Sequence, residues 1–136
     1  MVDRGAIEQL FSQYAAAIDN QEWELLDAIF LDDAVWRMES PGGEAIDQRG
    51  LRAIKEFLPG SRADGQTRHI FTNLYVLDED GDSASVTMYM TFAVTDQGEF
   101  NVVMTSVYTA DVVHTPSGWR FRRFSLTPDR PYWENA

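Results

Sequence analysis

His69 is the residue of this sequence whose type and setting point most directly to chemistry. It lies in the segment 67–73, whose apolar residues otherwise predict a buried β-strand. The chain has only two histidines, and the other, His114, adjoins the turn sequence 115–118. Because histidine has an ordinary pKa near neutral pH, a histidine in such a strand can take up and return a proton. A structural role through hydrogen bonds is the open alternative.

Two further polar residues are candidates to contact a ligand near a proton-transfer site. Asn73 shares a strand face with His69 when residues are counted in twos, so we expect it to orient a substrate or to cap a turn. The same counting places Arg123 on the face of Trp119 and Phe121. Arg123 is therefore a candidate to contact an anion or oxyanion of the substrate from this face, although a salt bridge is the favoured interpretation.

The sequence predicts a reaction that needs neither a metal nor a cofactor. The chain has no cysteine, which excludes disulfides, thiolate ligands and a cysteine nucleophile. The two histidines are far apart in the sequence and the carboxylates are scattered, so no metal-ligand spacing is visible. The chain also has no Gly-X-Gly-X-X-Gly motif or phosphate loop.

Length and charge narrow the class of protein. The 136 residues fit a single domain over 1–136. The net charge of −11 argues against nucleic acid as a partner, because phosphate binding needs a basic surface. The N-terminal residues do not read as a signal peptide, and no apolar run is long enough to span a bilayer. We therefore expect a cytoplasmic protein without a membrane partner.

The elements that must position these residues change type along the chain. Apolar residues at helical spacing predict a first helix over 7–18, a second over 23–30 and a short third over 50–58. A short strand is predicted at 34–38, followed by a loop at 41–43. Long strands are predicted at 67–77, 84–95, 100–113 and 119–126, joined by turn sequences, with an irregular tail that includes Tyr132 and Trp133.

Three helices followed by an antiparallel meander predict an α+β fold with a strongly twisted sheet. Helices packed on its concave face would leave a pocket inside a cone, although the same residues can also form an ordinary core. The residues we expect to line that pocket are apolar or aromatic: Tyr14, Trp36, Met88, Met90, Phe92, Met104 and Tyr108.

Four segments, taken in order, carry a resemblance to a known family. They are 14–26 (YAAAIDNQEWELL), 32–36 (DDAVW), 68–73 (RHIFTN) and 118–121 (GWRF). In order and spacing they resemble the SnoaL-like branch of the nuclear transport factor 2-like superfamily over nearly the whole chain. The resemblance implies a cone-shaped α+β barrel, with three N-terminal helices packed on a strongly curved, mixed or antiparallel sheet.

Within that branch the chain resembles three lyases: scytalone dehydratase, bile-acid 7α-dehydratase and hexachlorocyclohexane dehydrochlorinase. These share an aspartate at the end of the first helix and a histidine in the strand after the third helix, and Asp19 and His69 match them. Tyr14 matches a tyrosine of the bile-acid enzyme, where the dehydrochlorinase has a lysine. The chain lacks the second histidine of scytalone dehydratase, near Phe92. The resemblance therefore implies a type of site and leaves the substrate open.

The implied chemistry is proton transfer. We expect His69 to act as a general base, Asp19 to fix its tautomer, and Tyr14 to donate a hydrogen bond to a substrate oxygen. A solvated Asp19 and a core Tyr14 are the structural alternatives. The predicted function is a cofactor-independent, dehydratase-like lyase acting on a small hydrophobic cyclic or polycyclic molecule.

Other functions remain open at this point. An isomerase or a polyketide cyclase can use the same base. A non-catalytic ligand-binding protein, or the β subunit of a ring-hydroxylating dioxygenase, would use none. The resemblance implies a homo-oligomer, either a trimer or a dimer.

Overall fold

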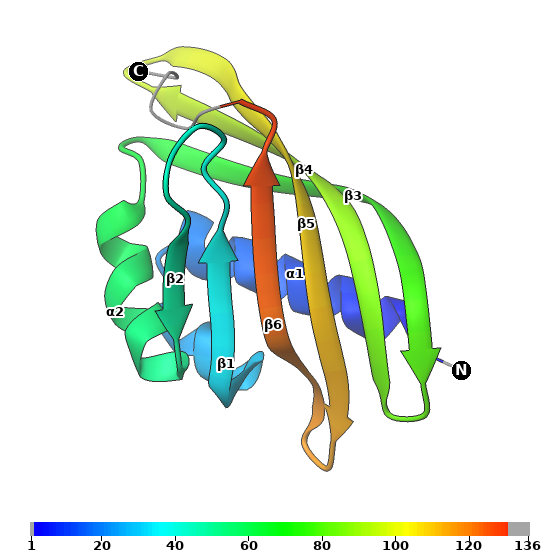
Figure 1. The fold of residues 1–136 in the computed structure, drawn as a ribbon. Helices are drawn as coiled ribbons and strands as arrows, with labels where there is room; N and C mark the ends of the chain where they lie inside the picture. Colours follow the sequence, from blue (N-terminus) through cyan, green and yellow to red (C-terminus); the bar gives the residue numbers. More distant parts are fainter. Residues whose placement is uncertain (1, 131–136) are drawn as a thin grey trace.

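The computed structural model describes residues 2–130, in which helices cover one face of a six-stranded sheet (Figure 1). The helical elements are α1 (Arg4–Asp19), the 3₁₀ helix η1 (Trp23–Ala28) and α2 (Leu51–Ser61). The strands are β1 (Phe30–Met38), β2 (Ile46–Arg49), β3 (Gln66–Asp80), β4 (Ser83–Asp96), β5 (Glu99–Thr115) and β6 (Gly118–Pro128). The predicted tail residues Tyr132 and Trp133 lie outside the described residues.

The sheet is mixed, strongly curved and open. Its strand order is β2-β1-β6-β5-β4-β3, and β1 runs parallel to β6 while every other neighbouring pair is antiparallel. The long hairpins of β3, β4 and β5 bend strongly, and α1 lies across the sheet, packed on β3 and β6 (Figure 1). The predicted α+β cone is confirmed, with a sheet that does not close because β2 and β3 remain as edges.

The predicted first helix is confirmed, and its limits have local causes. The side chain of Asp3 accepts a hydrogen bond from the backbone N–H of Ala6, which caps the start of α1. The apolar stripe predicted along α1 is buried throughout. The helix ends where Asn20 takes a non-helical conformation and Gln21 has a φ of +56°. The stripe anchors α1 to the sheet and holds Asp19, its last residue, at the inner face.

Three boundaries differ from the predicted ones. The second helix is a 3₁₀ helix that ends at Ala28, because Phe30 pairs with Phe121 and begins β1. β2 was not predicted, since its four residues follow a loop and have no alternating apolar pattern. α2 continues through Pro59 to Ser61, so the proline lies in the last turn of the helix instead of after its end.

Two β-bulges overturn the facing predicted for Asn73 and Arg123. In β3, Thr72 pairs with Tyr89 and Tyr75 pairs with Thr87, so β3 has one extra residue between these two pairs. Asn73 lies in this bulge with a φ of +63°, and its side chain is exposed. In β6, an extra residue between Phe121 and Arg123 buries Phe121 and leaves Arg123 exposed. Counting in twos fails at both sites because a bulge shifts the alternation by one residue.

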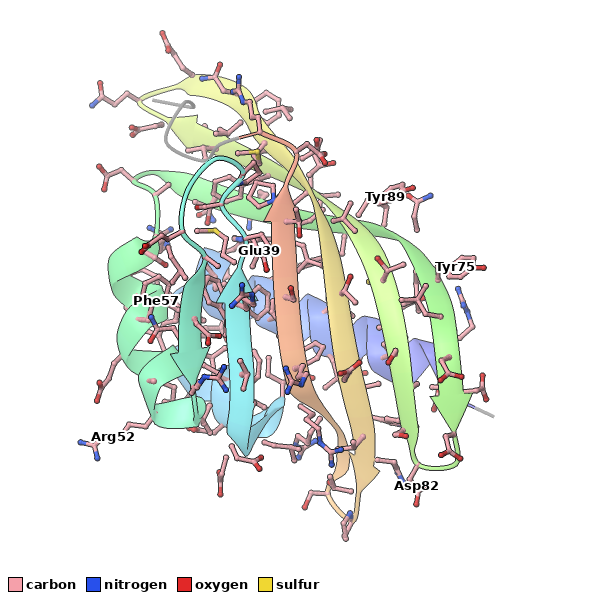
Figure 2. The ribbon with its side chains drawn as sticks, in the orientation of Figure 1. Glu39, Arg52, Phe57, Tyr75, Asp82 and Tyr89 are labelled. Carbon is pink, nitrogen blue, oxygen red and sulfur yellow. The ribbon has the colours of Figure 1, made fainter. Side chains whose placement is uncertain are left out.

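The core lies between α1 and the inner face of the sheet. Aromatic rings dominate it, with centroid distances of 5.1 Å between Phe11 and Phe121 and 4.3 Å between Tyr14 and Phe124. Outside this core, Tyr75 and Tyr89 lie on the side of the sheet away from α2 (Figure 2), and both side chains are exposed. Within residues 2–130, no helix is long and apolar enough to cross a membrane.

Candidate functional site

A cavity of about 260 Å³ opens between α1, α2 and the inner face of the sheet. Seven of the residues predicted for the site or its pocket line it: Tyr14, Trp36, His69, Met90, Phe92, Met104 and Tyr108. α2 contributes Phe57, which lies beside β2 in Figure 2 and whose ring centroid is 5.2 Å from that of Trp36. The cavity is therefore largely apolar, with a few polar side chains.

Three residues predicted for the site lie elsewhere. Asn73 and Arg123 are exposed because of the bulges described above. Met88 is buried, but it borders a separate hollow beside the N-terminal part of α1 rather than the cavity. The rings of Phe11 and Phe71, 5.1 Å apart, pack α1 against β3, and Phe71 borders the same hollow as Met88.

The carboxylate of Asp19 is held at the end of α1 by residues of β3. Asp19 is 6% exposed. Its Oδ1 accepts hydrogen bonds from Thr67 Oγ1 at 2.8 Å and pairs with His69 Nδ1 at 2.7 Å, and its Oδ2 accepts from the backbone N–H of His69 at 2.8 Å. Gln66 Nε2 also donates to the backbone oxygen of Asp19. We call Asp19, Gln66, Thr67 and His69 the α1–β3 junction.

The position of β3 at the sheet edge makes this junction possible. An edge strand has backbone N–H groups that no neighbouring strand accepts, and α1 ends beside that edge. The backbone N–H of His69 is one of these groups, and Asp19 accepts its hydrogen bond. Thr67 and His69 are two residues apart and so face the same side of β3. One carboxylate can therefore meet the hydroxyl, the ring and the backbone together.

The junction assigns the tautomer of His69. With the Asp19 carboxylate 2.7 Å from Nδ1, the neutral form of the ring carries its proton on Nδ1 and its lone pair on Nε2. The imidazole side chain is 10% exposed and lines the cavity. No described residue hydrogen-bonds to Nε2. Asp19 itself does not line the cavity, so it acts behind the ring, and Nε2 is the basic atom available to a ligand.

Opposing effects set the charge state of Asp19. Burial alone would raise the pKa of this carboxyl, but the hydrogen bonds from His69, the attraction of its ring whenever that ring is protonated, and the bond from Thr67 together outweigh burial and lower the pKa. Asp19 is therefore a carboxylate at neutral pH. A buried negative charge next to the ring stabilises the imidazolium that forms when Nε2 takes a proton.

Tyr14 keeps a hydroxyl hydrogen that it can donate toward the cavity. Its phenol oxygen accepts a hydrogen bond from Trp36 Nε1 at 3.0 Å, and its ring meets His69 edge to face with a centroid distance of 6.2 Å. Burial raises the pKa of Tyr14 well above its ordinary value; the bond from Trp36 opposes that rise and the charge of Asp19 adds to it. The phenol stays protonated, and no described residue accepts its hydrogen.

The sequence interpretation missed four polar residues of the cavity wall: Ser61, Arg62, Thr67 and Ser106. Thr67 and Ser106 were detectable in principle, since each shares a strand face with a predicted site residue when residues are counted in twos. Arg62 had no such signal; its guanidinium donates to the backbone oxygens of Ile18, Ala63 and Gly65. Within residues 2–130, no cluster of three or more His, Asp or Glu side chains could hold a metal ion.

Known proteins resemble this chain in sequence and in fold. A family model described as a SnoaL-like domain matches residues 1–125. An uncharacterized protein of Mycobacterium tuberculosis is 31% identical over 123 residues, which are 89% of this chain and 82% of that protein.

Two solved structures from Novosphingobium aromaticivorans are also similar. A candidate aromatic ring hydroxylase is 30% identical, with a TM-score of 0.78 over 95% of this chain and 90% of that one. The β subunit of a candidate aromatic-ring-hydroxylating dioxygenase has a TM-score of 0.80 over 93% of this chain and 88% of that one. It is 16% identical and shows the shared fold alone.

Proposed function

Because this chain belongs to the SnoaL-like domain family, we propose that its cavity is the active site of a cofactor-independent lyase, a dehydratase for a small cyclic molecule. The observation that carries this proposal is the buried Asp19–His69 pair, which leaves Nε2 facing an apolar cavity. Ligand pockets commonly measure roughly 300–1,000 Å³. A cavity of about 260 Å³ therefore favours the small end of the cyclic substrates considered.

The proposed reaction begins with removal of a proton from carbon. His69 Nε2 takes a proton from the carbon next to a substrate carbonyl, and the electron pair of that C–H bond moves to the carbonyl oxygen. Tyr14 donates a hydrogen bond to this developing oxyanion, and the Trp36 N–H orients the phenol for it. Asp19 stabilises the imidazolium through Nδ1.

Loss of water completes the reaction. The enolate re-forms its carbonyl, a carbon–carbon double bond forms, and the bond to a hydroxyl on the next carbon breaks. The imidazolium of His69 returns its proton to that hydroxyl, which leaves as water. One base thus both removes and supplies the proton. If the proton returns to a different carbon instead, the same groups perform an isomerisation.

Hydrogen exchange tests the proton-abstraction step without knowledge of the natural substrate. We expect the protein in D₂O to accelerate deuteration of 1-indanone beside its carbonyl, measured by NMR. His69→Gln should slow that exchange by roughly 10²–10⁴-fold, the usual contribution of a positioned base. His114→Gln is the matched control, because His114 does not line the cavity. Equal exchange in the His69→Gln variant and the unaltered protein would refute the proposal.

A second probe separates elimination from isomerisation. 3-Hydroxy-1-indanone carries a hydroxyl on the carbon that follows the acidic one, so a dehydratase converts it to indenone. Exchange of its acidic hydrogen without loss of water would favour the isomerase.

The 30% identity to a candidate aromatic ring hydroxylase favours a second function, that of a partner subunit in an aromatic ring-hydroxylating complex. Such a subunit would not need a base facing a cavity. Expression in the native host separates the two functions: co-purification with a large iron–sulfur protein supports the partner subunit, and isolation as a homo-oligomer supports the enzyme.

A further inference from the structure

Ser106 is a buried serine whose hydroxyl has no hydrogen-bond partner among residues 2–130. The side chain is on β5 and the residue is 2% exposed. The other buried polar residues of the described chain, Asp19 and Thr67, are bonded to each other. A buried hydroxyl without a partner destabilises a fold, so an unpaired one in a native structure calls for an explanation, such as a catalytic role or a bound partner.

The register of the sheet places Ser106 in the wall of the cavity. It pairs with Met90 on β4 and with Pro128 on β6, and all three residues line the cavity. The adjacent row across the sheet contains His69, Phe92 and Met104. Ser106 is therefore one row from His69 and two strands away from it, on the same face.

The neighbours of Ser106 explain why its hydroxyl is unpaired. A methionine and a proline flank it on the two adjacent strands, and Met104 and Tyr108 flank it along its own face. We call Met104, Ser106 and Tyr108 the β5 wall. In contrast, Thr87 on β4 donates its hydroxyl to the backbone oxygen of Tyr108. A strand hydroxyl in this sheet can thus bond locally, and Ser106 does not.

We propose that Ser106 determines specificity by hydrogen-bonding to a second oxygen of the ligand. In the proposed reaction, Tyr14 on α1 donates a hydrogen bond to the carbonyl oxygen, and His69 on β3 takes the proton from the neighbouring carbon. Ser106 on β5 would contact a separate oxygen of the ligand. For an elimination, that group is the departing hydroxyl. The substrate class is then a small cyclic hydroxyketone, rather than a simple ketone or a hydrocarbon. That the first oxygen of the ligand is a ketone carbonyl rests on the proposed function. The hydrogen bond to a second oxygen rests on Ser106 alone.

Binding of two alcohols tests this contact without any turnover. 1-Indanol has one oxygen and 1,3-indanediol has two, and neither has a hydrogen acidified by a carbonyl. By calorimetry, we expect the unaltered protein to bind the diol roughly 5- to 10-fold more tightly, the usual effect of one hydrogen bond. Ser106→Ala should bind 1-indanol as before and lose the preference for the diol. No preference in the unaltered protein, or a preserved preference in Ser106→Ala, would overturn the inference.

A matched serine provides the control. Ser85 on β4 donates its hydroxyl to Asp111 Oδ1 at 2.6 Å and does not line the cavity, so Ser85→Ala should keep the diol preference.

Without ligand, Ser106→Ala should melt at a higher temperature than the unaltered protein, because it loses an unpaired buried hydroxyl. A lower melting temperature would contradict the unpaired state of Ser106. A protein that prefers the diol through Ser106 but exchanges no protons would retain this inference and lose the proposed function.

Discussion

The α1–β3 junction and the β5 wall border the same cavity, yet they treat buried polar atoms in opposite ways. At the junction, both carboxylate oxygens of Asp19 are bonded, and they hold Thr67 and His69 in place. On the β5 wall, the hydroxyl of Ser106 has no partner among the described residues. The junction is thus organised without a ligand, whereas our proposal gives Ser106 its partner in the ligand.

That difference has a functional meaning. A general base must keep its geometry through the reaction, which favours a fully bonded support. A specificity contact discriminates best between two ligands when only the correct ligand supplies its hydrogen-bond partner. A ligand that lacks the matching group then leaves a buried polar atom of the protein unpaired. Under the two proposals, catalysis and recognition are divided between β3 and β5, which are two strands apart in one sheet.

Asp19→Asn should break the junction with the largest effect. An amide keeps the shape of the side chain, but it lacks the charge that fixes the His69 tautomer and stabilises the imidazolium. We expect proton exchange into 1-indanone to fall by roughly 10²–10⁴-fold with the fold retained. NMR rates beside a circular dichroism spectrum check this. Activity close to that of the unaltered protein would show that Asp19 has only a structural role.

Thr67→Val should sharpen the contrast through stability. This change removes the hydrogen bond to Asp19 Oδ1 and replaces the hydroxyl by a methyl group of similar size. We expect the free energy of unfolding to fall by about 1.5–3 kcal/mol, the range for hydrogen bonds to charged groups. Urea titration measures it. Loss of a hydroxyl should therefore destabilise the junction, whereas Ser106→Ala stabilises the β5 wall. If both variants changed the free energy of unfolding in the same direction, the contrast between the junction and the β5 wall would be refuted.

The smallest effect concerns pH. Because the folded pKa of Asp19 lies below its ordinary value of 3.8, the unfolded chain takes up this proton first as the pH falls. The stabilising contribution of Asp19 is complete above that ordinary value and is lost as the pH falls through the lower folded pKa. The melting temperatures of the unaltered protein and Asp19→Asn should therefore converge on acidification from about pH 6 to about pH 3. A constant difference over that range would contradict the lowered pKa.

Helical periodicity was sufficient to predict α1 and its buried stripe, because each of those residues contacts the sheet at a regular interval. The alternating pattern likewise identified β3 to β6 and placed Met90, Phe92 and Tyr108 on the face that lines the cavity. The predicted side of the sheet was wrong for Asn73 and Arg123, because a bulge adds one residue near each of them. Bulges depend on how two strands pair, which a pattern within one strand does not contain.

The amino-acid sequence by itself determined the order of the helices and of every strand except β2, the apolar faces, and a histidine and an aspartate in positions that suggest a dyad. Tertiary structure alone decided that Asp19 touches His69, that Trp36 directs the phenol of Tyr14, and that Ser106 is left unpaired. The physical reason is the distance in sequence: Asp19 and His69 are 50 residues apart. Contacts of that kind form only when the end of a helix meets a strand at the free edge of a curved sheet.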